Sequence, residues 1–327
     1  MTEDLQHNYY YSVSTEHRGG VGISPREHGP VFSKTELCLR TLCDHGVDIN
    51  ATLDHSSRHT ALHLAVRYKV PPAVPILASY GADVNAESSC GMTPLHMASA
   101  SLRKDMVSSL IRLGADVNAI IPLTGNTPLH MATTAAAVQP DKGPETSGVG
   151  CISELLEGGA DPGVANRAGR TPLQEACCFG EEGLVDALLS HGGTADIDRG
   201  TEASEGCLFL FLDGCPANVW RAGGLLSKLL CLSSPPRLAA RDRLGRPPAA
   251  LAGPRHAAQR ERLLALSQQP RSLRDLCKRS VYLSHGRGRR EALRDILPHA
   301  IFDFVFDRWD APGGVSFDDA AASVCQS

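Results

Sequence analysis

Aromatic residues make up only 5% of this 327-residue sequence, so large rings cannot dominate its core. Alanine and leucine must fill the interior instead, which favours short, closely packed helices. No stretch reaches the roughly 20 consecutive apolar residues that a membrane helix needs. Residues 1–30 are polar and lack the apolar core of a signal peptide. We therefore expect a cytoplasmic protein, with the nucleus as a second location and no membrane contact.

The sequence also lacks the motifs that mark common enzymes and metal sites. It contains no glycine-rich phosphate loop, no G-x-S-x-G and no H-E-x-x-H. Its 11 cysteines include no Cys-x-x-Cys pair, so neither a zinc site nor a secreted disulfide framework is predicted. Several cysteines occupy positions where we expect a helix to bury them: Cys38, Cys151, Cys177, Cys207 and Cys231. The protein is predicted not to be an enzyme and to need no cofactor or metal.

Two motifs recur along the chain with one shared period. The first is Thr-Pro-Leu-His-x-Ala or a close variant, and its threonines lie 33, 34 and 44 residues apart, at Thr60, Thr93, Thr127 and Thr171. The second is Gly-x-Asp, and its glycines lie 35, 33 and 45 residues apart, at Gly46, Gly81, Gly114 and Gly159. Two motifs with a common period of about 33 residues resemble the ankyrin-repeat family.

Each residue of these motifs suits a particular place in a pair of helices. A threonine before the helix accepts a backbone N–H, and the proline after it has no donor to leave unpaired. The glycine suits the left-handed conformation that often ends a helix. Because no unit of this kind can bury its apolar face alone, the units must stack. We predict an all-α ankyrin solenoid of helix-loop-helix units joined by short hairpin loops.

The histidines of the first motif invite a metal or catalytic interpretation, because His55, His59 and His63 are four residues apart. On one helix that spacing would place three ligands on one face. However, His55 and His59 precede the helix, and His63 recurs as His96 and His130. The resemblance implies a structural role instead, in which the histidine ties a loop to the start of a helix by hydrogen bonds.

A different pattern begins at Ser272. Ser272 and Asp275 form a capping-box pattern, and an apolar stripe with helical spacing follows. The stripe is Leu273, Leu276, Cys277 and Val281. This segment resembles the SOCS box, and the downstream Leu297-Pro298 resembles that family's Leu-Pro-x-Pro element, with Ala300 where the second proline would stand. The alternative is that these helices only cap the apolar face of the last repeat.

The combination of array and box implies a function by resemblance. Ankyrin-repeat and SOCS-box proteins are substrate adaptors of elongin–cullin-RING ubiquitin ligases. The resemblance implies that the stripe binds elongin B/C through elongin C, that Leu297 and Pro298 bind a cullin of the cullin-5 type, and that the array binds an unidentified protein target. The alternative is an ankyrin scaffold with no ligase link. Nucleic acid is not an expected partner, although residues 235–306 hold 15 Lys and Arg against 6 Asp and Glu.

We divide the chain into four parts. We expect a disordered segment over 1–33, the array over 34–268, SOCS-box-like helices over 269–310 and a flexible tail over 311–327. Within the array we expect a half cap, four clear units and two weak units, at 34–50, 58–85, 91–118, 125–161, 169–196, 202–232 and 243–268. The third clear unit contains an insertion over 136–148, whose Pro, Gly and charged residues predict a mobile surface loop.

The hairpin tips differ between units, so we expect them to bind the target. The candidate residues are Asp54, His55, Arg58, Glu87, Ile120, Ile121, Leu123, Asn166 and Arg167. The tip at 120–123 is apolar where solvent is expected, so it either contacts the target or folds onto a neighbouring tip.

A separate hypothesis concerns the asparagines that follow the second motif. Asn50, Asn85 and Asn118 each have an Asp at −2 and a Leu at −8. This pattern resembles the site that an asparaginyl hydroxylase modifies in ankyrin proteins. The alternative is that all three are ordinary repeat residues.

Overall fold

The computed structural model describes residues 28–53, 56–139, 148–191, 197–198, 206–214, 223–234, 240, 242, 245–268, 270–285 and 290–308. The chain forms two compact units, Met1–Val47 and Asp48–Ser327, and each is described by itself. Every regular element of the described residues is helical, which confirms the predicted all-α class. None of these helices is long and apolar enough to cross a membrane.

The first unit contains helix α2 (His28–Asp44). The helix begins inside the segment 1–33 that we predicted to be disordered, so that boundary is wrong. Pro30 lies in its first turn, where a missing N–H is tolerated because first-turn donors have no partner within the helix. The expected half cap over 34–50 is split between the two units. Cys38 is exposed, contrary to our expectation.

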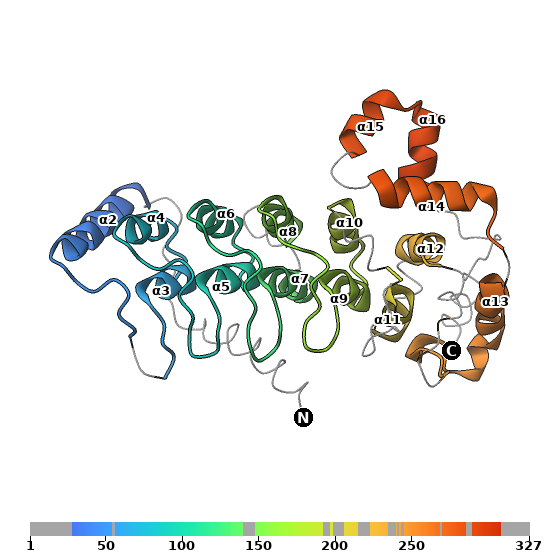
Figure 1. Ribbon diagram of the computed structural model, residues 1–327, viewed down its shortest axis with the longest axis horizontal. Helices are drawn as coiled ribbons and strands as arrows, with labels where there is room; N and C mark the ends of the chain where they lie inside the picture. The colour runs from blue at the N-terminus through green and yellow to red at the C-terminus, as the bar shows by residue number, and fades with distance from the viewer. Residues whose placement is uncertain are drawn as a thin grey trace. The chain divides into compact units, whose positions relative to one another are not determined.

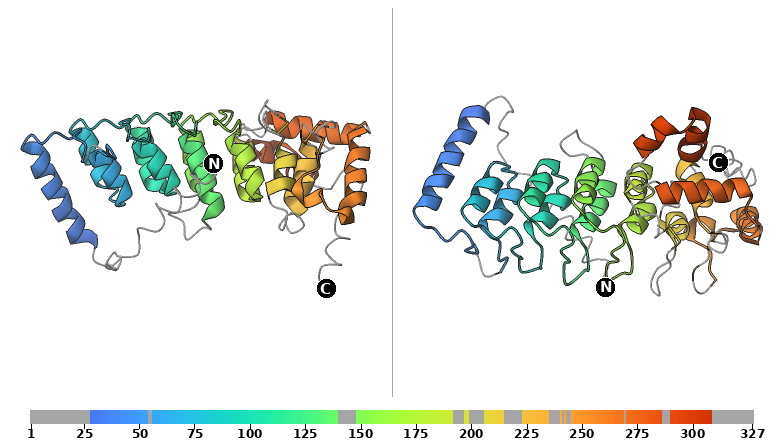
Figure 2. Two further views of the ribbon diagram at one scale, coloured as in Figure 1. Left: turned by 90° about the horizontal axis from the view of Figure 1, so that it is seen from below. Right: turned by 45° about the horizontal axis from the view of Figure 1, so that its top comes forward.

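In the second unit, pairs of helices lie in two rows (Figure 1). The first helices of the pairs form the row nearer the hairpin loops: α3 (Ala61–Arg67), α5 (Pro94–Ala100), α7 (Pro128–Val138), α9 (Pro172–Phe179) and α11 (Cys207–Gly214). The second helices form the other row: α4 (Ala73–Ser79), α6 (Lys104–Arg112), α8 (Gly148–Glu157), α10 (Glu182–Ser190) and α12 (Gly223–Leu232). Each first helix packs on the next first helix, and the hairpin loops project to one side (Figure 2). This stack confirms the predicted solenoid.

The repeated motifs form the elements that their residue types predict. Thr93 and Thr171 are N-caps, and each side-chain oxygen lies 3.4 Å from the backbone nitrogen three residues later, which donates to it. Gly81, Gly114 and Gly159 follow second helices with φ angles of 87°, 89° and 94°. A Cβ atom on any of these glycines would meet no atom within 4 Å. The left-handed backbone, and not a shortage of space, therefore requires glycine there.

Small apolar side chains fill the core between the helices. The leucine of each first motif is buried, at Leu62, Leu95, Leu129 and Leu173. Four of the five cysteines that we expected inside are also buried, at Cys151, Cys177, Cys207 and Cys231. Burial raises the pKa of the Cys151 thiol to about 12, so this thiol stays protonated and behaves as a small apolar group.

The insertion of the third clear unit lies between α7 and α8, but it is shorter than the predicted 136–148. Helix α7 continues to Val138, and α8 already begins at Gly148. A Cβ atom on Gly148 would lie 2.3 Å from the Cβ of Ala136, so glycine allows the two helices to touch. The predicted mobile loop falls on 140–147, which lies outside the described residues.

Both weak units contain a pair of helical segments. Helices α11 and α12 form the first pair. The second opens with a hairpin in which the Asp242 N–H donates to the Arg246 carbonyl oxygen (3.0 Å). A short 3-10 turn, η5 (Ala249–Leu251), replaces the first α-helix, and η6 (Pro254–His256) precedes α13 (Ala257–Gln268). Pro248 caps η5 and Pro254 begins η6, and a proline at position 254 interrupts the longer helix that other repeats form here.

The array is followed by four short helical elements. They are α14 (Leu273–His285), α15 (Arg290–Ile296), α16 (His299–Phe302) and the π-helical turn η7 (Asp303–Asp307). Helix α14 packs on α12 on one side and on η7 on another, and Figure 1 shows it between α12 and the pair α15–α16. This module has the helical content that we predicted for residues 269–310.

Candidate protein-binding surfaces

The recurring histidines are buried at the starts of the first helices. In His63, Nδ1 accepts a hydrogen bond from the backbone N–H of Thr60 (3.2 Å), and Nε2 lies 3.0 Å from the carbonyl oxygen of Met92 in the next hairpin. His96 and His130 repeat this arrangement, with Nε2 3.3 and 3.0 Å from the carbonyl oxygen of the following hairpin. A neutral ring with its proton on Nε2 satisfies both partners. The structural role that the resemblance implied is confirmed.

Burial holds these histidines in the neutral form. Desolvation lowers the pKa of His96 to about 4, and it lowers the pKa of His63 and His130 as well. Histidines in the unfolded chain titrate near 6.5. Because the folded pKa lies below the unfolded one, the unfolded chain binds protons first as the pH falls. The stability that the neutral rings contribute is therefore present above about pH 6.5 and is lost toward pH 4.

The three asparagines connect each repeat to the next. Asn50 donates from Nδ2 to the Gly81 carbonyl oxygen (3.1 Å), and its Oδ1 accepts from the Asp83 N–H (2.8 Å). Asn85 makes the same two bonds one repeat later (3.3 and 2.8 Å), as does Asn118 (3.2 and 2.8 Å). Each amide is thus bonded on both sides within the array, which accounts for asparagine at this repeat position.

The hairpin-tip residues that we expected to bind a target differ in exposure. Asp54 and His55 lie outside the described residues. Five of the others are exposed: Arg58, Glu87, Ile120, Leu123 and Arg167. Two are buried, at 5% and 6% exposure: Ile121 and Asn166. The prediction that these two side chains contact a target is wrong.

The third tip turns one isoleucine inward and leaves its neighbours outside. The Ile121 N–H donates to the Asn126 carbonyl oxygen (3.0 Å), and the Gly125 N–H donates to the Ile121 carbonyl oxygen (2.8 Å). Successive side chains of an extended segment point to opposite sides, so Ile121 packs inward while Ile120 points outward. Ile120 and Leu123 are 53% and 79% exposed. Ile121 is therefore folded inward, whereas contact of Ile120 and Leu123 with a target stays a prediction.

Asn166 is buried because it organises the hairpin of the fourth clear unit. Its Oδ1 accepts from two backbone N–H groups of its own hairpin (3.0 and 3.1 Å). Its Nδ2 donates to Asn126 Oδ1 (3.0 Å) and to Glu175 Oε1 (2.9 Å). Thr134 Oγ1 donates to the second oxygen of the same carboxylate (2.7 Å). These bonds fix Glu175 on the first-helix side of the array. Among the described residues, no cluster of three or more His, Cys, Asp or Glu side chains could hold a metal ion.

One face of helix α14 packs on the aromatic residues of η7. Arg274 Cζ lies 4.4 Å from the centroid of the Phe304 ring, and Lys278 Nζ lies 5.0 Å from the same centroid. One turn further, the Tyr282 and Phe306 rings have centroids 5.8 Å apart. Spacing of four residues places Arg274, Lys278 and Tyr282 on one side of the helix. The run 301–306 therefore supports α14.

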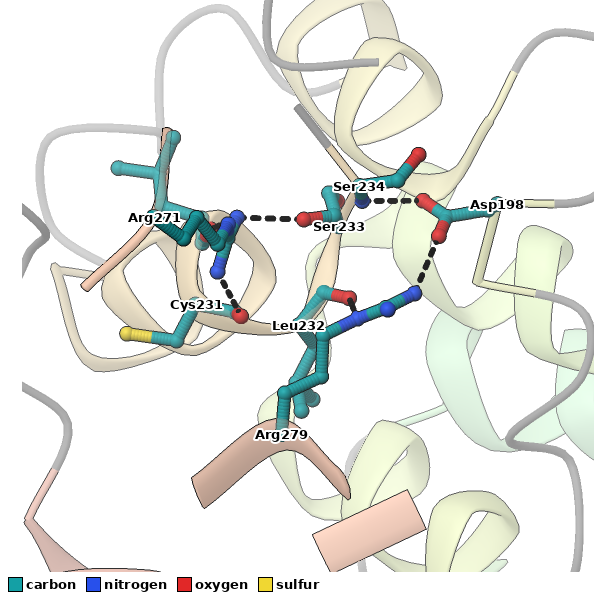
Figure 3. Close-up of polar contacts among 8 residues, drawn as sticks. Asp198, Cys231, Leu232, Ser233, Ser234, Arg271 and Arg279 are labelled. Carbon is teal, nitrogen blue, oxygen red and sulfur yellow. Dashed lines mark hydrogen bonds and ion pairs between the residues drawn. The ribbon is translucent and has the colours of Figure 1, made fainter. Parts of the chain in front are cut away.

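Arg279 on a second face of α14, together with Arg271 just before the helix, contacts the end of α12 (Figure 3). The guanidinium of Arg271 donates to the carbonyl oxygens of Leu230, Cys231 and Ser233. Arg279 Nε donates to the Leu232 carbonyl oxygen (2.6 Å). The last carbonyls of a helix have no partner within it and carry partial negative charge, so cationic donors suit them.

Asp198 completes this cluster. Its carboxylate lies 2.6 Å from Arg279 Nη2 and accepts the Ser234 N–H (2.8 Å), as Figure 3 shows. We call Arg271, Arg279 and Asp198 the arginine cluster. The sequence does not indicate this cluster, because Asp198 lies far from both arginines in the chain. Its only signal was the excess of arginine in residues 235–306.

The third face of α14 carries the predicted elongin-binding stripe. Leu273 and Leu276 are 77% and 45% exposed, Cys277 is exposed and Val281 is half-buried. Ser272 caps this helix, since its Oγ accepts the Asp275 N–H (3.1 Å) and donates to the Asp275 carboxylate (2.7 Å). Three of the four stripe residues thus lie on a surface that a partner can reach.

The predicted cullin-binding residues form the turn between α15 and α16. The Leu297 N–H donates to the Leu293 carbonyl oxygen (2.8 Å) and so ends α15. Pro298 caps α16, and its carbonyl oxygen accepts from the N–H groups of Ile301 (2.9 Å) and Phe302 (3.0 Å). Leu297 is half-buried and Pro298 is exposed, so the two residues shape this turn while only the proline is fully accessible.

Comparisons with known proteins agree with this architecture. A family model described as ankyrin repeats in three copies matches residues 73–139, and a single ankyrin repeat matches 124–167 and 168–202. Putative ankyrin repeat protein FPV223 of Fowlpox virus (strain NVSL) is 33% identical over 151 residues, which cover 46% of this chain and 96% of that protein. The chain belongs to the ankyrin-repeat family. Its array is accordingly a module that binds protein targets.

Two further relatives carry a SOCS box in their names. Ankyrin repeat and SOCS box protein 16 of Mus musculus is 30% identical over 199 residues, and its Homo sapiens counterpart is 29% identical over 193 residues. Each match covers 50% of this chain. The chain spans only 42% of the length of these two relatives.

Proposed function

We propose that this protein is a substrate-recognition adaptor of an elongin–cullin-RING ubiquitin ligase. The array binds the target, and α14 binds elongin C. The observation that carries the proposal is the outward position of Leu273, Leu276 and Cys277 on a helix whose other two faces are already packed. A helix that served only as a cap would turn its apolar stripe toward the array. The likeness to two proteins named for a SOCS box supports the same function.

The second candidate is an ankyrin scaffold with no ligase link. The arginine cluster favours it, because Arg271 and Arg279 attach α14 to the end of α12 and thereby cover the array. This candidate explains the attachment of the module. It does not explain why the apolar stripe faces away from the array.

The deciding experiment is co-purification with elongins B and C. Leu273→Asp places a charge in the stripe and should abolish co-purification, because a charge buried against an apolar partner surface is costly. Cys277→Phe tests the neighbouring position by steric bulk. Leu123→Asp is the matched control, since Leu123 has nearly the same exposure (79% against 77%) but lies on a hairpin tip.

The wild-type chain and Leu123→Asp should both retain elongin. Thermal unfolding of all variants checks that the array is intact. A wild-type chain that recovers no elongin, or a Leu273→Asp variant that still recovers it, rejects the adaptor function and leaves the scaffold.

For the cullin, we propose contact through the exposed Pro298 beside Leu297, with a cullin of the cullin-5 type. Ala300 stands where the family's second proline would lie, and its side chain is exposed at the start of α16. We therefore expect cullin affinity below that of a complete Leu-Pro-x-Pro element, and Ala300→Pro should raise it. Binding of purified cullin to the chain–elongin complex measures this directly.

Two further assignments belong to this proposal. The first is a location in the cytoplasm, with the nucleus as a second site, which fluorescence microscopy of the tagged chain would test. The second is a closer resemblance to ankyrin repeat domain-containing protein 61, carried by Met92–Asn118, Thr124–Leu129 and Cys277–Arg279. That resemblance concerns the fold and the composition of the chain. The proposed recruitment of the ligase still depends on α14.

The asparagine hypothesis is also a proposal. Asn85 is exposed and Asn118 is half-buried, yet both amides are bonded to the next repeat. An asparaginyl hydroxylase would have to open these bonds to reach the side chain. The test is the mass of the peptides that contain Asn50, Asn85 and Asn118, measured on protein purified from cells. A mass increase of one oxygen atom would show hydroxylation, and unchanged masses would reject the hypothesis.

A further inference from the structure

The hairpins and first helices of two neighbouring repeats lack cationic side chains entirely. Residues 81–102 and 113–139 contain no Lys or Arg, and their acidic residues Asp83, Glu87 and Asp116 are all exposed. These ranges include α5 and α7 with the hairpin before each helix. We call the surface that they form the anionic face.

Among the described residues of the same repeats, the cations lie on the other row of helices. Arg103, Lys104 and Arg112 belong to α6 or to its start. Arg103 pairs with Asp105 (3.1 Å) and Lys104 pairs with Glu154 (3.2 Å), so two of them are already partnered there. The separation of charge between the two rows leaves the hairpin side with net negative charge.

The two hairpins of the anionic face touch each other and form one surface. A Cβ atom on Gly91 would lie 2.3 Å from Pro122 Cδ, so the second hairpin rests directly against the third. Ile120, Pro122 and Leu123 are exposed at this junction. An exposed apolar group on a surface whose charged side chains are carboxylates is suited to a ligand that combines apolar and cationic side chains.

The neighbouring hairpins limit the extent of this surface. Arg58 in the hairpin before it and Arg167 in the hairpin after it are both exposed cations. They would repel a long basic ligand at either end. The complementary ligand is therefore a short segment, with basic residues close to one apolar anchor.

We propose that the anionic face binds a segment of the target protein that presents an apolar side chain flanked by Lys or Arg. Leu123 and Ile120 contact the apolar side chain, and Glu87, Asp83 and Asp116 attract the flanking cations. This inference rests on the array's role in binding the target and not on the elongin contact of α14.

The test selects peptides from a random library displayed on phage, with the full chain immobilised. The selected peptides should be enriched in large apolar residues together with Lys and Arg, relative to the starting library. A selected peptide is then labelled, and its affinity for the wild-type chain and for the variants is measured by fluorescence anisotropy. Affinity should fall as salt is raised, because exposed charges are screened.

Two variants address the two parts of the surface. Leu123→Asp removes the apolar anchor and should weaken binding by about tenfold or more, as expected for an anchor residue that becomes buried when the peptide binds. Glu87→Lys reverses one charge and should weaken binding by about threefold to tenfold at low salt. Leu273→Asp and Glu157→Lys are the matched controls, because both residues are exposed but lie outside the anionic face. Both controls should bind the peptide normally.

Several results would overturn the proposal. They are a selection that yields no binding peptide, enrichment of Asp and Glu, or equal affinity of Leu123→Asp and the wild type. If the chain self-associates, and if both Leu123→Asp and Leu273→Asp abolish this self-association, the anionic face binds a second copy of the chain instead. The elongin experiment gives an independent answer, because Leu123→Asp must keep elongin whether or not it binds the peptide.

Discussion

Side chains pair backbone groups both between the repeats and between α12 and α14, but the side chains differ in kind. In the repeats, recurring histidines and asparagines bond to the next unit, and the same atoms recur about every 33 residues. At the α12–α14 junction, two arginines satisfy the end of a single helix. The first arrangement is neutral, periodic and local to neighbouring units. The second is charged and occurs once.

This difference decides what each contact contributes. A neutral histidine between two buried backbone groups contributes through the cost of leaving those groups unpaired. An arginine at a helix end contributes through charge, partly in contact with water, and is weakened by screening. We therefore expect the repeat contacts to control the stability of the array, and the junction to control only the attachment of α14.

The largest expected effect comes from removing one buried histidine. His96→Ala leaves the Thr93 N–H and the Asn126 carbonyl oxygen without their partner and opens a cavity. We expect the free energy of unfolding to fall by about 4 kcal/mol. Urea unfolding followed by circular dichroism measures this loss.

The chain itself offers the matched control for this change. In the fourth clear unit, Gln174 stands at the position of the histidine, and its Oε1 accepts the Thr171 N–H (3.0 Å). His96→Gln should therefore cost only about 1 kcal/mol. If His96→Gln and His96→Ala were equally unstable, the ring itself and not its hydrogen bonds would be responsible.

The pH dependence should show the next largest effect. Because burial lowers the pKa of His96 to about 4, this residue alone should cost on the order of 3 kcal/mol as the pH falls from about 6.5 toward 4. His96→Gln removes that titration, so its stability should fall less steeply over the same range. The difference between the two proteins isolates the histidine from carboxylates that titrate in both. Parallel pH curves would contradict the lowered pKa of His96.

The array was predictable from sequence because its contacts repeat. Thr, Pro and Gly have local backbone preferences that hold in every unit, and the period multiplies each weak signal. The same reasoning failed to predict whether an individual side chain at a hairpin tip is buried or exposed. The backbone bond from Ile121 to Asn126 has counterparts in the other hairpins, so it does not distinguish the buried Ile121, whereas the bond of Asn166 to Glu175 depends on a residue pair that the repeat motif does not contain.

The α14 region was predictable only in part, for a related reason. Helical spacing placed Leu273, Leu276 and Cys277 on one side of α14, and the structure exposes that side. Spacing within one helix cannot say what covers its other faces. The contacts of Arg279 with Asp198 and α12 join residues more than 40 positions apart, and no local pattern indicates them.

The smallest expected effect comes from the arginine cluster. Replacing both Arg271 and Arg279 by alanine leaves four carbonyl groups at the end of α12 to water and frees α14 from the array. We expect the attachment of α14 to weaken by about 2 kcal/mol, the usual contribution of hydrogen bonds to charged groups after partial exposure. Amide hydrogen exchange should speed up in α14 and in the last turn of α12, while the exchange in α5 and α7 stays unchanged.

Two controls separate attachment from folding in this experiment. Arg294→Ala removes an exposed arginine of the same module that lies outside the cluster, and it should leave the exchange in α14 unchanged. High salt should increase exchange in α14 of the wild type and should have less effect on α5 and α7, because the histidine and asparagine contacts of the repeats are neutral. If the double variant instead lowered the stability of α5 and α7, the junction would be part of the cooperative array. The two kinds of contact would then differ in their chemistry but not in their contribution to the stability of the array.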